Sequence, residues 1–245
     1  MMKNKKPLLT RYPRRIIYEF KFSLKRIYRT CFDKNFTPIK LDYDWGKMPQ
    51  RYDILNTIIR KKKVNHYLEI GCCDDDTFGR ILCKHKVGVD PERGGNFRGT
   101  SDEFFKVNKD VFDLVFIDGL HTKEQVKKDV ENALACTTEN ALIVLHDCLP
   151  GYYEAQLVTR ETSEWTGDVW KELVRIRTLD DLNAFCLIAD FGLGVIQKTD
   201  NRNKLHLKKD PYQLTFIDFV ENHKEYLNLV PVDKFLNELE NESVL

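Results

Sequence analysis

The sequence predicts an α/β fold with a mostly parallel, seven-stranded sheet, helices on both of its faces and a closing antiparallel hairpin. Two observations predict it. Between residues 52 and 145, short and continuously apolar runs alternate with segments of helical periodicity, which is typical of a parallel sheet covered on both faces. Two further apolar runs, at 185–189 and 194–196, are only a few residues apart and indicate the hairpin.

The expected elements follow one another with short connections. A helix at 52–60 comes first, and apolar runs at 66–70 and 87–90 predict two strands with a helical segment between them. A short strand near Phe97 precedes a helix that begins at Asp102, where Ser101 is a suitable N-cap. The later elements are a strand at 114–117, a helix at 123–135, a strand at 141–145, a turn-like and then helical region at 151–177, the hairpin, and terminal helices within 213–240.

The length and composition fit one domain with two appendages. A chain of 245 residues can bury a full core, and we expect an N-terminal extension over 1–40, a central domain over 41–210 and a helical appendage over 211–245. The net charge of +1 gives no general preference for nucleic acid. The seven cysteines are odd in number and lack a repeated CxxC spacing, which indicates reduced thiols in a cytoplasmic protein and disfavours zinc.

The N-terminal extension is strongly basic. Glu19 and Asp33 are the only acids among its first 34 residues, and Ile17, Phe20, Leu24, Ile27 and Cys31 recur at helical spacing. This pattern predicts a basic amphipathic helix within residues 11–32. Two interpretations stay open: peripheral contact with an anionic membrane, or packing of the apolar stripe on the protein's own domain.

The turn after the first strand indicates which ligand binds. Residues 66–90 read HYLEIGCCDDDTFGRILCKHKVGVD, which is a strand, a tight turn, a helical segment and a second strand that ends in an acid, Asp90. Gly71 is the only glycine kept in the turn, and Asp74, Asp75 and Asp76 stand where a pyrophosphate would lie. These carboxylates would repel NAD or FAD and tolerate a cationic ligand such as S-adenosylmethionine.

Four further segments extend the pattern: FDLVFIDGLHTKEQVKKDVENAL at 112–134, ALIVLHDCLP at 141–150, WTGDVWKELVRIR at 165–177 and ADFGLGVI at 189–196. With the first turn, they resemble the class I S-adenosylmethionine-dependent methyltransferases, over roughly residues 45–200 and in a bacterial branch associated with sugar and polysaccharide biosynthesis. The resemblance implies a Rossmann-like fold and O-methylation of a sugar or glycan intermediate in the cytoplasm.

The resemblance also implies the cofactor site. Glu69 and Gly71 would border the methionine part, Asp90 would accept hydrogen bonds from the ribose hydroxyls, and Ser101 and Asp102 would lie near the adenine. Asp118, directly after the next strand, is expected to complete the set of cofactor-binding residues. Cys73 and Asp75 depart from the glycine-rich pattern of the family.

The catalytic candidates follow two neighbouring strands. Asp118 and His121 come after one strand, and His146 and Asp147 come after the next, so the fold should bring all four to one rim. His121 or His146 would remove the acceptor's hydroxyl proton, and a carboxylate such as Asp147 would fix the tautomer of the base. The sequence does not decide between the two histidines.

A divalent cation is a second possibility for the same rim. Asp118 and Asp147 stand where related methyltransferases place metal ligands, but His146 and Cys148 replace the more usual oxygen ligands. We therefore favour base catalysis without a metal.

The tryptophans after this rim have different expected roles. Trp170 lies at helical spacing with Leu173 and Val174 and is expected in the core. Trp165 and Asp168 are candidates for the acceptor site, because an aromatic face beside a carboxylate suits a sugar.

Three alternatives remain beside a glycan O-methyltransferase. The acceptor could be a phenolic or other small molecule. The unusual GCCDDD turn and Asn140 would also fit a methyltransferase-like binding module without activity. An NAD-dependent oxidoreductase is opposed by the aspartates of the turn.

Overall fold

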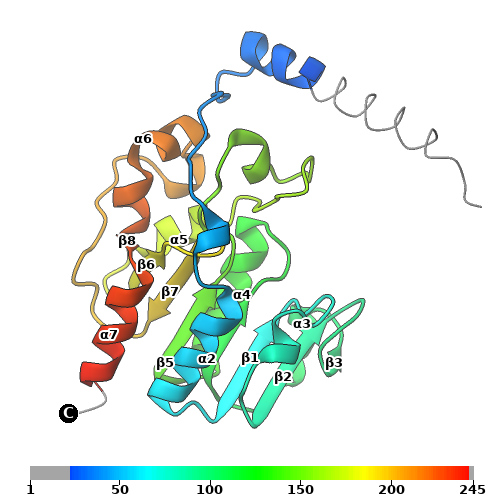
Figure 1. The fold of residues 1–245 in the computed structure, drawn as a ribbon, viewed down its shortest axis with the longest axis vertical. Coiled ribbons are helices and arrows are strands. Elements are labelled where there is room, and N and C mark those ends of the chain that lie inside the picture. Colours follow the sequence, from blue (N-terminus) through cyan, green and yellow to red (C-terminus); the bar gives the residue numbers. More distant parts are fainter. Residues whose placement is uncertain (1–22, 243–245) are drawn as a thin grey trace, which may run out of the picture. The chain divides into compact units, whose positions relative to one another are not determined.

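The computed structural model describes residues 23–242, with side chains as far as Leu239 (Figure 1). Contacts within the chain define two compact units, Met1–Pro38 and Ile39–Leu245. In the first unit residues 23–32 are helical, as predicted, and the rings of Tyr28 and Phe32 lie 5.0 Å apart. The rest of the predicted basic helix, residues 11–22, lies outside the described residues. None of the described helices is long and apolar enough to cross a membrane.

The second unit is built on one sheet with the strand order β3-β2-β1-β4-β5-β7-β6-β8. Its strands are β1 (His66–Ile70), β2 (His85–Asp90), β3 (Phe97–Arg98), β4 (Phe112–Ile117), β5 (Thr137–Leu145), β6 (Asn183–Leu187), β7 (Leu193–Gln197) and β8 (Leu229–Val230). Only β7 runs antiparallel to its neighbours, β5 and β6. The predicted parallel sheet with a closing hairpin is therefore confirmed.

The prediction of seven strands is wrong by one, because β8 lies where only helices were expected. Asn228 ends the preceding helix in the left-handed conformation, with φ of 47°. The chain turns there, and Leu229 and Val230 pair in parallel with Cys186 and Leu187 of β6. A two-residue strand is too short to leave a periodic pattern in the sequence.

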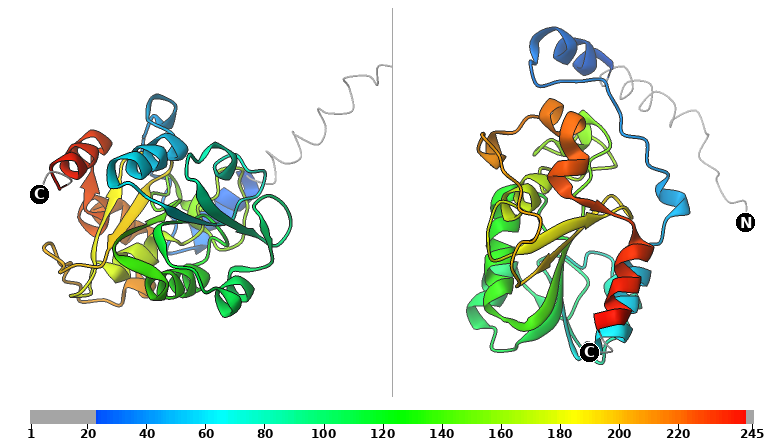
Figure 2. Two further views of the ribbon diagram at one scale, coloured as in Figure 1. Left: turned by 90° about the horizontal axis from the view of Figure 1, so that it is seen from below. Right: turned by 90° about the vertical axis from the view of Figure 1, so that its left-hand side faces the viewer.

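Helices cover both faces of the sheet (Figure 2). One face carries α2 (Arg51–Lys62) and α7 (Val232–Glu242), which pack side by side, and the other carries α3 (Ser101–Val107), α4 (Lys123–Ala135) and α5 (Trp170–Ile176). The sixth helix, α6 (Phe216–Leu227), packs against α5 and β6. Short 3-10 helices are η2 (Trp45–Lys47), η3 (Phe78–Arg80), η4 (Tyr153–Gln156) and η5 (Pro211–Gln213).

The C-terminal helix α7 belongs to the core of this unit. Val232, Phe235 and Leu239 are buried in the same apolar cluster as Ile54 and Ile58 of α2. Such burial contributes about 1.5 to 3 kcal/mol per large apolar side chain.

The N-cap of α3 differs from the prediction. Thr100, not Ser101, precedes the helix, and its side chain and that of Glu103 form a reciprocal capping box. Ser101 is the first helical residue. Thr100 and Ser101 both have a hydroxyl that could cap the helix. Only Thr100 is followed three positions later by an acid, Glu103, which completes the capping box.

The predicted helix between β1 and β2 is also wrong. The structure describes all of residues 71–84, and their helical part is limited to the short 3-10 helix η3 (Phe78–Arg80). Cys73 and Asp75 have positive φ angles of 48° and 63°, and the Asp75 Oδ1 accepts a hydrogen bond of 2.7 Å from the backbone N–H of Gly95. Asp75 therefore ties the turn to the connection between β2 and β3, and a helix cannot start there.

Candidate active site

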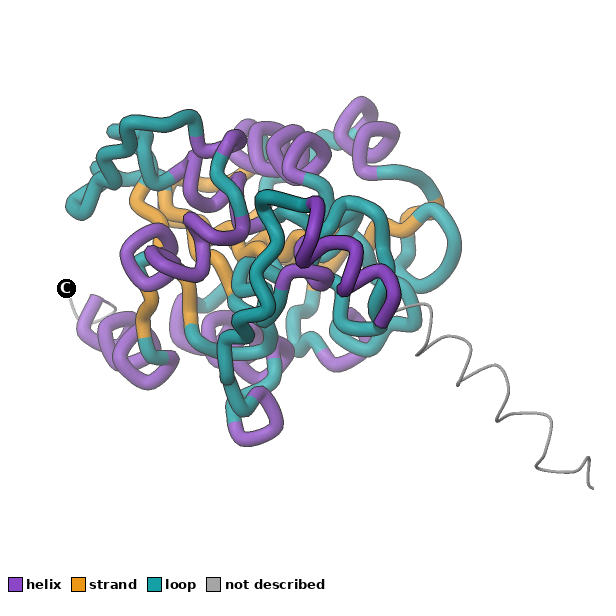
Figure 3. Tube along the Cα trace, turned by 90° about the horizontal axis from the view of Figure 1, so that it is seen from above, coloured by secondary structure: helices purple, strands orange, loops and turns teal. Residues whose placement is uncertain are grey.

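A cavity of about 810 Å³ lies at the carboxyl ends of the parallel strands. Figure 3 looks onto this end of the sheet, where loops follow the strands. All nine residues predicted for the site line the cavity, namely Glu69, Gly71, Asp90, Ser101, Asp102, Asp118, His121, His146 and Asp147. The fold thus brings together groups that are up to 78 residues apart, from Glu69 to Asp147.

Gly71 is required by the packing of the backbone. Its φ is +90°, and a Cβ added there would lie 2.1 Å from the carbonyl oxygen of Asp118. The loop after β1 and the loop after β4 therefore approach each other more closely than any side chain permits. Gly71 thereby places Asp118 beside the first turn.

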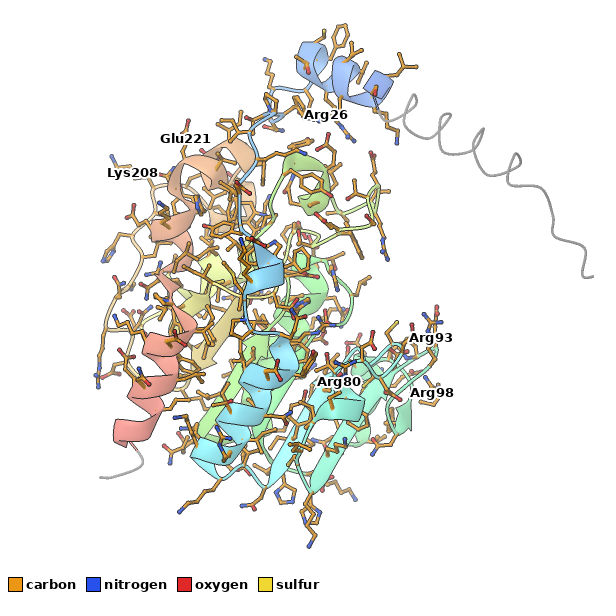
Figure 4. All side chains as sticks on the ribbon, viewed as in Figure 1. Arg26, Arg80, Arg93, Arg98, Lys208 and Glu221 are labelled. Atoms are coloured by element: carbon orange, nitrogen blue, oxygen red, sulfur yellow. The ribbon has the colours of Figure 1, made fainter. Side chains whose placement is uncertain are left out.

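Asp90 holds the loops around it and keeps its negative charge. Its Oδ1 accepts hydrogen bonds from the backbone N–H groups of Glu92 and Arg93, and its Oδ2 accepts one from Cys73. Burial raises the pKa of Asp90, but these donors outweigh burial and lower it overall. A carboxylate has about four acceptor positions, so Oδ2 has room for a further donor, such as a ribose hydroxyl. Arg93 and Arg98 lie at the β3 edge beside it (Figure 4).

Glu69 is buried near the end of β1, and the nearby carboxylate of Asp118 also raises its pKa. The hydroxyl of Tyr67 donates a hydrogen bond of 2.6 Å to its Oε2. Burial raises the pKa of Glu69 to about 8, although the bond from Tyr67 opposes the shift. Glu69 is therefore protonated at neutral pH in the free site.

The two histidines and two aspartates after β4 and β5 form one cluster. The Nδ1 of His146 lies 3.1 Å from Asp118 Oδ1, and the Nδ1 of His121 lies 3.0 Å from Asp147 Oδ2. A cross contact of 3.4 Å joins His121 Nε2 to Asp118 Oδ1. Asp147 has a positive φ of 61°, a conformation that turns the chain directly after His146.

The cluster is ionic at neutral pH. Burial lowers the pKa of His121, but hydrogen bonds to Asp118 and Asp147 outweigh it and raise the pKa to about 10. The same two carboxylates raise the pKa of His146 well above its usual value, again against burial. Burial raises the pKa values of Asp118 and Asp147, but the charge of His146 and the bonds to both histidines lower them overall.

Two charged residues beside this cluster were not predicted from the sequence. Asp190, in the turn between β6 and β7, lies with its Oδ1 3.6 Å from His146 Nε2. The Asp190 Oδ2 accepts hydrogen bonds from the backbone N–H and the guanidinium of Arg51, at 2.9 and 3.0 Å. Arg51 also donates to the hydroxyl of Thr77 at 2.7 Å. No local motif marks these residues, because the contact spans 139 positions.

Ser101 and Asp102 share one hydrogen-bond donor. The side-chain amide of Gln125, on α4, donates to Ser101 Oγ at 3.2 Å and to Asp102 Oδ1 at 3.1 Å. Gln125 lines the same cavity and was not predicted. These three residues form the wall of the cavity on the predicted adenine side.

The two tryptophans after the rim and Asp168 lie in different surroundings, and of the three only Trp165 is among the residues that line the cavity. Trp170 is fully buried against Phe219, as predicted. Trp165 lines the cavity and stacks on His121, with ring centroids 4.9 Å apart. Asp168 is buried and accepts hydrogen bonds from the backbone N–H and the ammonium of Lys123. Asp168 therefore holds the start of α4, and its assignment to the acceptor site is wrong.

The cluster has the dimensions of a divalent cation site. One ligand atom each from Asp118, His121 and Asp147 can be chosen so that all lie within 4.8 Å of one another. Two carboxylates and one imidazole form a set that binds several divalent metals. His146 is not in this set, since its ring nitrogens face Asp118 and Asp190.

Comparisons with known proteins agree with this architecture. Residues 62–148 match the model of a family described as a methyltransferase domain, and no curated protein matches the chain. Among solved structures, a methyltransferase of Podospora anserina with S-adenosylhomocysteine bound is 15% identical, with a TM-score of 0.51, over 81% of this chain and 100% of that one.

Two bacterial structures are also similar. A putative caffeoyl-CoA O-methyltransferase from Staphylococcus aureus is 19% identical over 62% of this chain and 87% of that one, with a TM-score of 0.48. The O-methyltransferase TomG from Streptomyces achromogenes, in complex with S-adenosylmethionine, is 14% identical over 61% of this chain and 79% of that one, also with a TM-score of 0.48. The likeness to the Podospora structure shows the fold. Residues 62–148 thus match a methyltransferase domain, and the unit that contains them has the predicted Rossmann-like fold.

Proposed function

We propose that the protein transfers the methyl group of S-adenosylmethionine to a hydroxyl oxygen of a sugar or glycan intermediate. One observation carries the proposal: the first turn, the acid that ends β2 and the histidine–aspartate cluster all line one cavity. A methyl donor in the turn would then lie beside groups able to handle the acceptor's proton.

The walls of the cavity suit a cationic donor. Asp74, Asp76 and Asp90 line its first part, where they attract a sulfonium and an ammonium and repel phosphates. Asp90 offers its remaining acceptor position to a ribose hydroxyl. Ser101, Asp102 and Gln125 offer polar atoms at the adenine end.

His121 is the better placed of the two histidines to meet an acceptor. It lies beside Trp165 at the cavity wall, with its Nδ1 also 3.1 Å from the Trp165 carbonyl oxygen. His146 is more deeply buried and lies between Asp118 and Asp190. We therefore assign the contact with the hydroxyl to His121, and to His146 the role of holding Asp118 in place.

A divalent cation fits the same geometry, held by Asp118, His121 and Asp147. Such an ion would lower the pKa of a bound hydroxyl and so supply the alkoxide for methyl transfer. In that case the neutral form of His121 and the carboxylates of Asp118 and Asp147 would hold the ion. In the absence of an ion, His121 must first lose its own proton to act as a base.

The acceptor class rests on the family resemblance of the sequence and on the aromatic face of Trp165. Aromatic rings pack against the apolar CH patches of sugars. A phenolic hydroxyl is the alternative, since it would stack on the same ring.

Calorimetry and turnover on the full chain test the proposal together. We expect S-adenosylhomocysteine to bind and NAD not to bind, because the acidic turn repels a pyrophosphate. We expect His121→Ala to lower turnover on the order of a hundredfold while leaving S-adenosylhomocysteine affinity unchanged. Activity that EDTA removes and Mg²⁺ restores would assign the cluster to a metal. Binding of NAD in place of S-adenosylhomocysteine would refute the methyltransferase, and tight binding without any turnover would favour the inactive binding module.

A further inference from the structure

The acceptor end of the cavity is formed by the segment 157–166, which contributes Arg160 and Trp165. The indole of Trp165 is fixed at two points. Its Nε1 donates a hydrogen bond of 2.6 Å to the carbonyl oxygen of Leu157, and its ring is nearly parallel to that of His121, at 11°. A molecule that reaches His121 from this side therefore passes Trp165.

The guanidinium of Arg160 lies next to the same indole. Its Cζ is 5.9 Å from the centroid of the Trp165 ring. Its Nε and Nη2 donate to the carbonyl oxygens of Thr162 and Ser163. These bonds come from its own loop and position the charge without neutralising it.

Arg160 differs in this respect from the other arginines of the cavity. Arg51 pairs with Asp190 at 3.0 Å, and Arg93 pairs with Asp74 at 3.1 Å. Among the side chains of residues 23–239, no carboxylate oxygen lies within 4.0 Å of the Arg160 guanidinium. An arginine beside an aromatic wall, held by carbonyls and lacking an acid, is suited to binding an anionic ligand group.

We infer that the acceptor carries an anionic oxygen group, a phosphate or a carboxylate, which Arg160 binds while the reacting hydroxyl lies at His121. The inference rests on the proposed methyltransferase function and adds the charge of its acceptor. The cavity then has two opposite ends: the acids of the first turn face the cationic donor, and Arg160 faces the anionic acceptor. Arg160 thereby selects the substrate without touching the reacting atoms.

Matched pairs of acceptors test the inference with the full chain. Glucose is compared with glucose 1-phosphate and with glucuronate, which separates phosphate from carboxylate on a sugar frame, and catechol is compared with 3,4-dihydroxybenzoate, which tests a carboxylate on a phenolic frame. Binding is measured by calorimetry with S-adenosylhomocysteine present, and methyl transfer with radiolabelled S-adenosylmethionine. We expect an anionic member to bind or react in preference to its neutral partner.

Three variants identify the residue responsible. Arg160→Gln should raise Kd and KM for the anionic member at least about tenfold, the loss of one charge-assisted hydrogen bond, with kcat and S-adenosylhomocysteine affinity unchanged. Arg160→Lys should recover part of the loss because it keeps the charge and not the fork. Arg202→Gln, at an exposed arginine that lines a different hollow, should change nothing.

Equal use of neutral and anionic partners, an unaffected Arg160→Gln variant, or failure of every anionic probe to bind would each overturn the inference. These results are distinct from failure of the methyltransferase proposal, which would appear as loss of S-adenosylhomocysteine binding by the unmodified protein.

Discussion

Glu69 lines the cavity and has a raised pKa, so its charge can change when a cationic ligand binds. Because burial raises its pKa to about 8, the free protein holds a neutral carboxylic acid there at neutral pH. A cationic ligand in the cavity favours the ionised form, so below about pH 8 its binding releases a proton. We expect S-adenosylmethionine affinity to rise by up to about tenfold per pH unit from pH 6 and to level off above about pH 8.

Glu69→Gln is the matched variant for this prediction. Glutamine keeps the shape and the acceptor for the Tyr67 hydroxyl, and it does not titrate. Calorimetry between pH 6 and pH 9, in buffers of different ionisation enthalpy, measures both affinity and proton release. Any pH slope that both proteins share comes from the ligand or from another group of the protein. An equally steep slope in the variant would show that Glu69 is not the group that titrates.

The residues of the site were predictable where sequence order alone placed them. Asp118 and His146 each follow an apolar strand, and neighbouring parallel strands end at one edge. Asp190 and Arg51 obey no such rule. Their contact depends on how the hairpin and α2 come together, which neither segment encodes by itself.

At the level of elements, the contact between the loops after β1 and β4 depends on a single glycine. Gly71→Ala places a Cβ against the carbonyl of Asp118 and imposes a φ of +90° on a residue that resists it. We expect a loss of at least about 3 kcal/mol in the free energy of unfolding, from the strain and the displaced loop. Urea denaturation measures it.

Gly46→Ala is the control for that substitution. A Cβ at Gly46 meets only Asp44 Oδ1, at the ordinary distance of 3.6 Å. Its effect should stay within about 0.5 kcal/mol. Similar losses in the two variants would mean that the approach of the loops is not what requires glycine at position 71.

Elements with strong local signals were predicted closely, and those fixed by distant contacts were not. The helix α4 has the predicted bounds, because Thr122 caps it and apolar residues follow at helical spacing. The segment after Gly71 has apolar residues at helical spacing too, yet the bond from Gly95 to Asp75 holds it as a turn. β8 forms because β6 offers an open edge, which its own two residues do not reveal.

At the scale of the whole molecule, we expect membrane binding to depend on the first unit and the melting temperature to depend on the second. We expect the full chain to sediment with vesicles containing phosphatidylserine at low salt and to be released at high salt, because each Lys or Arg near an anionic surface contributes about 1 kcal/mol and salt screens it. A chain that starts at Ile39 should not bind and should keep its melting temperature, since the contacts divide the protein at that point.

The alternative interpretation gives the opposite result. If the apolar stripe of the extension packs on the second unit, removal of residues 1–38 should lower the melting temperature, and neither chain should bind vesicles. Absence of sedimentation at every salt concentration would reject the membrane proposal.

The turn between β6 and β7 has a consequence for how this protein can evolve. Hairpin loops ordinarily tolerate insertions and deletions, but three consecutive residues here, Asp190, Phe191 and Gly192, have positive φ. The same turn supplies the carboxylate that joins Arg51 to His146, so one added or missing residue would break this link. Descendants of this protein are therefore free to change length in the exposed segment around residue 200, whereas natural selection should hold the turn at 188–192 to a single length.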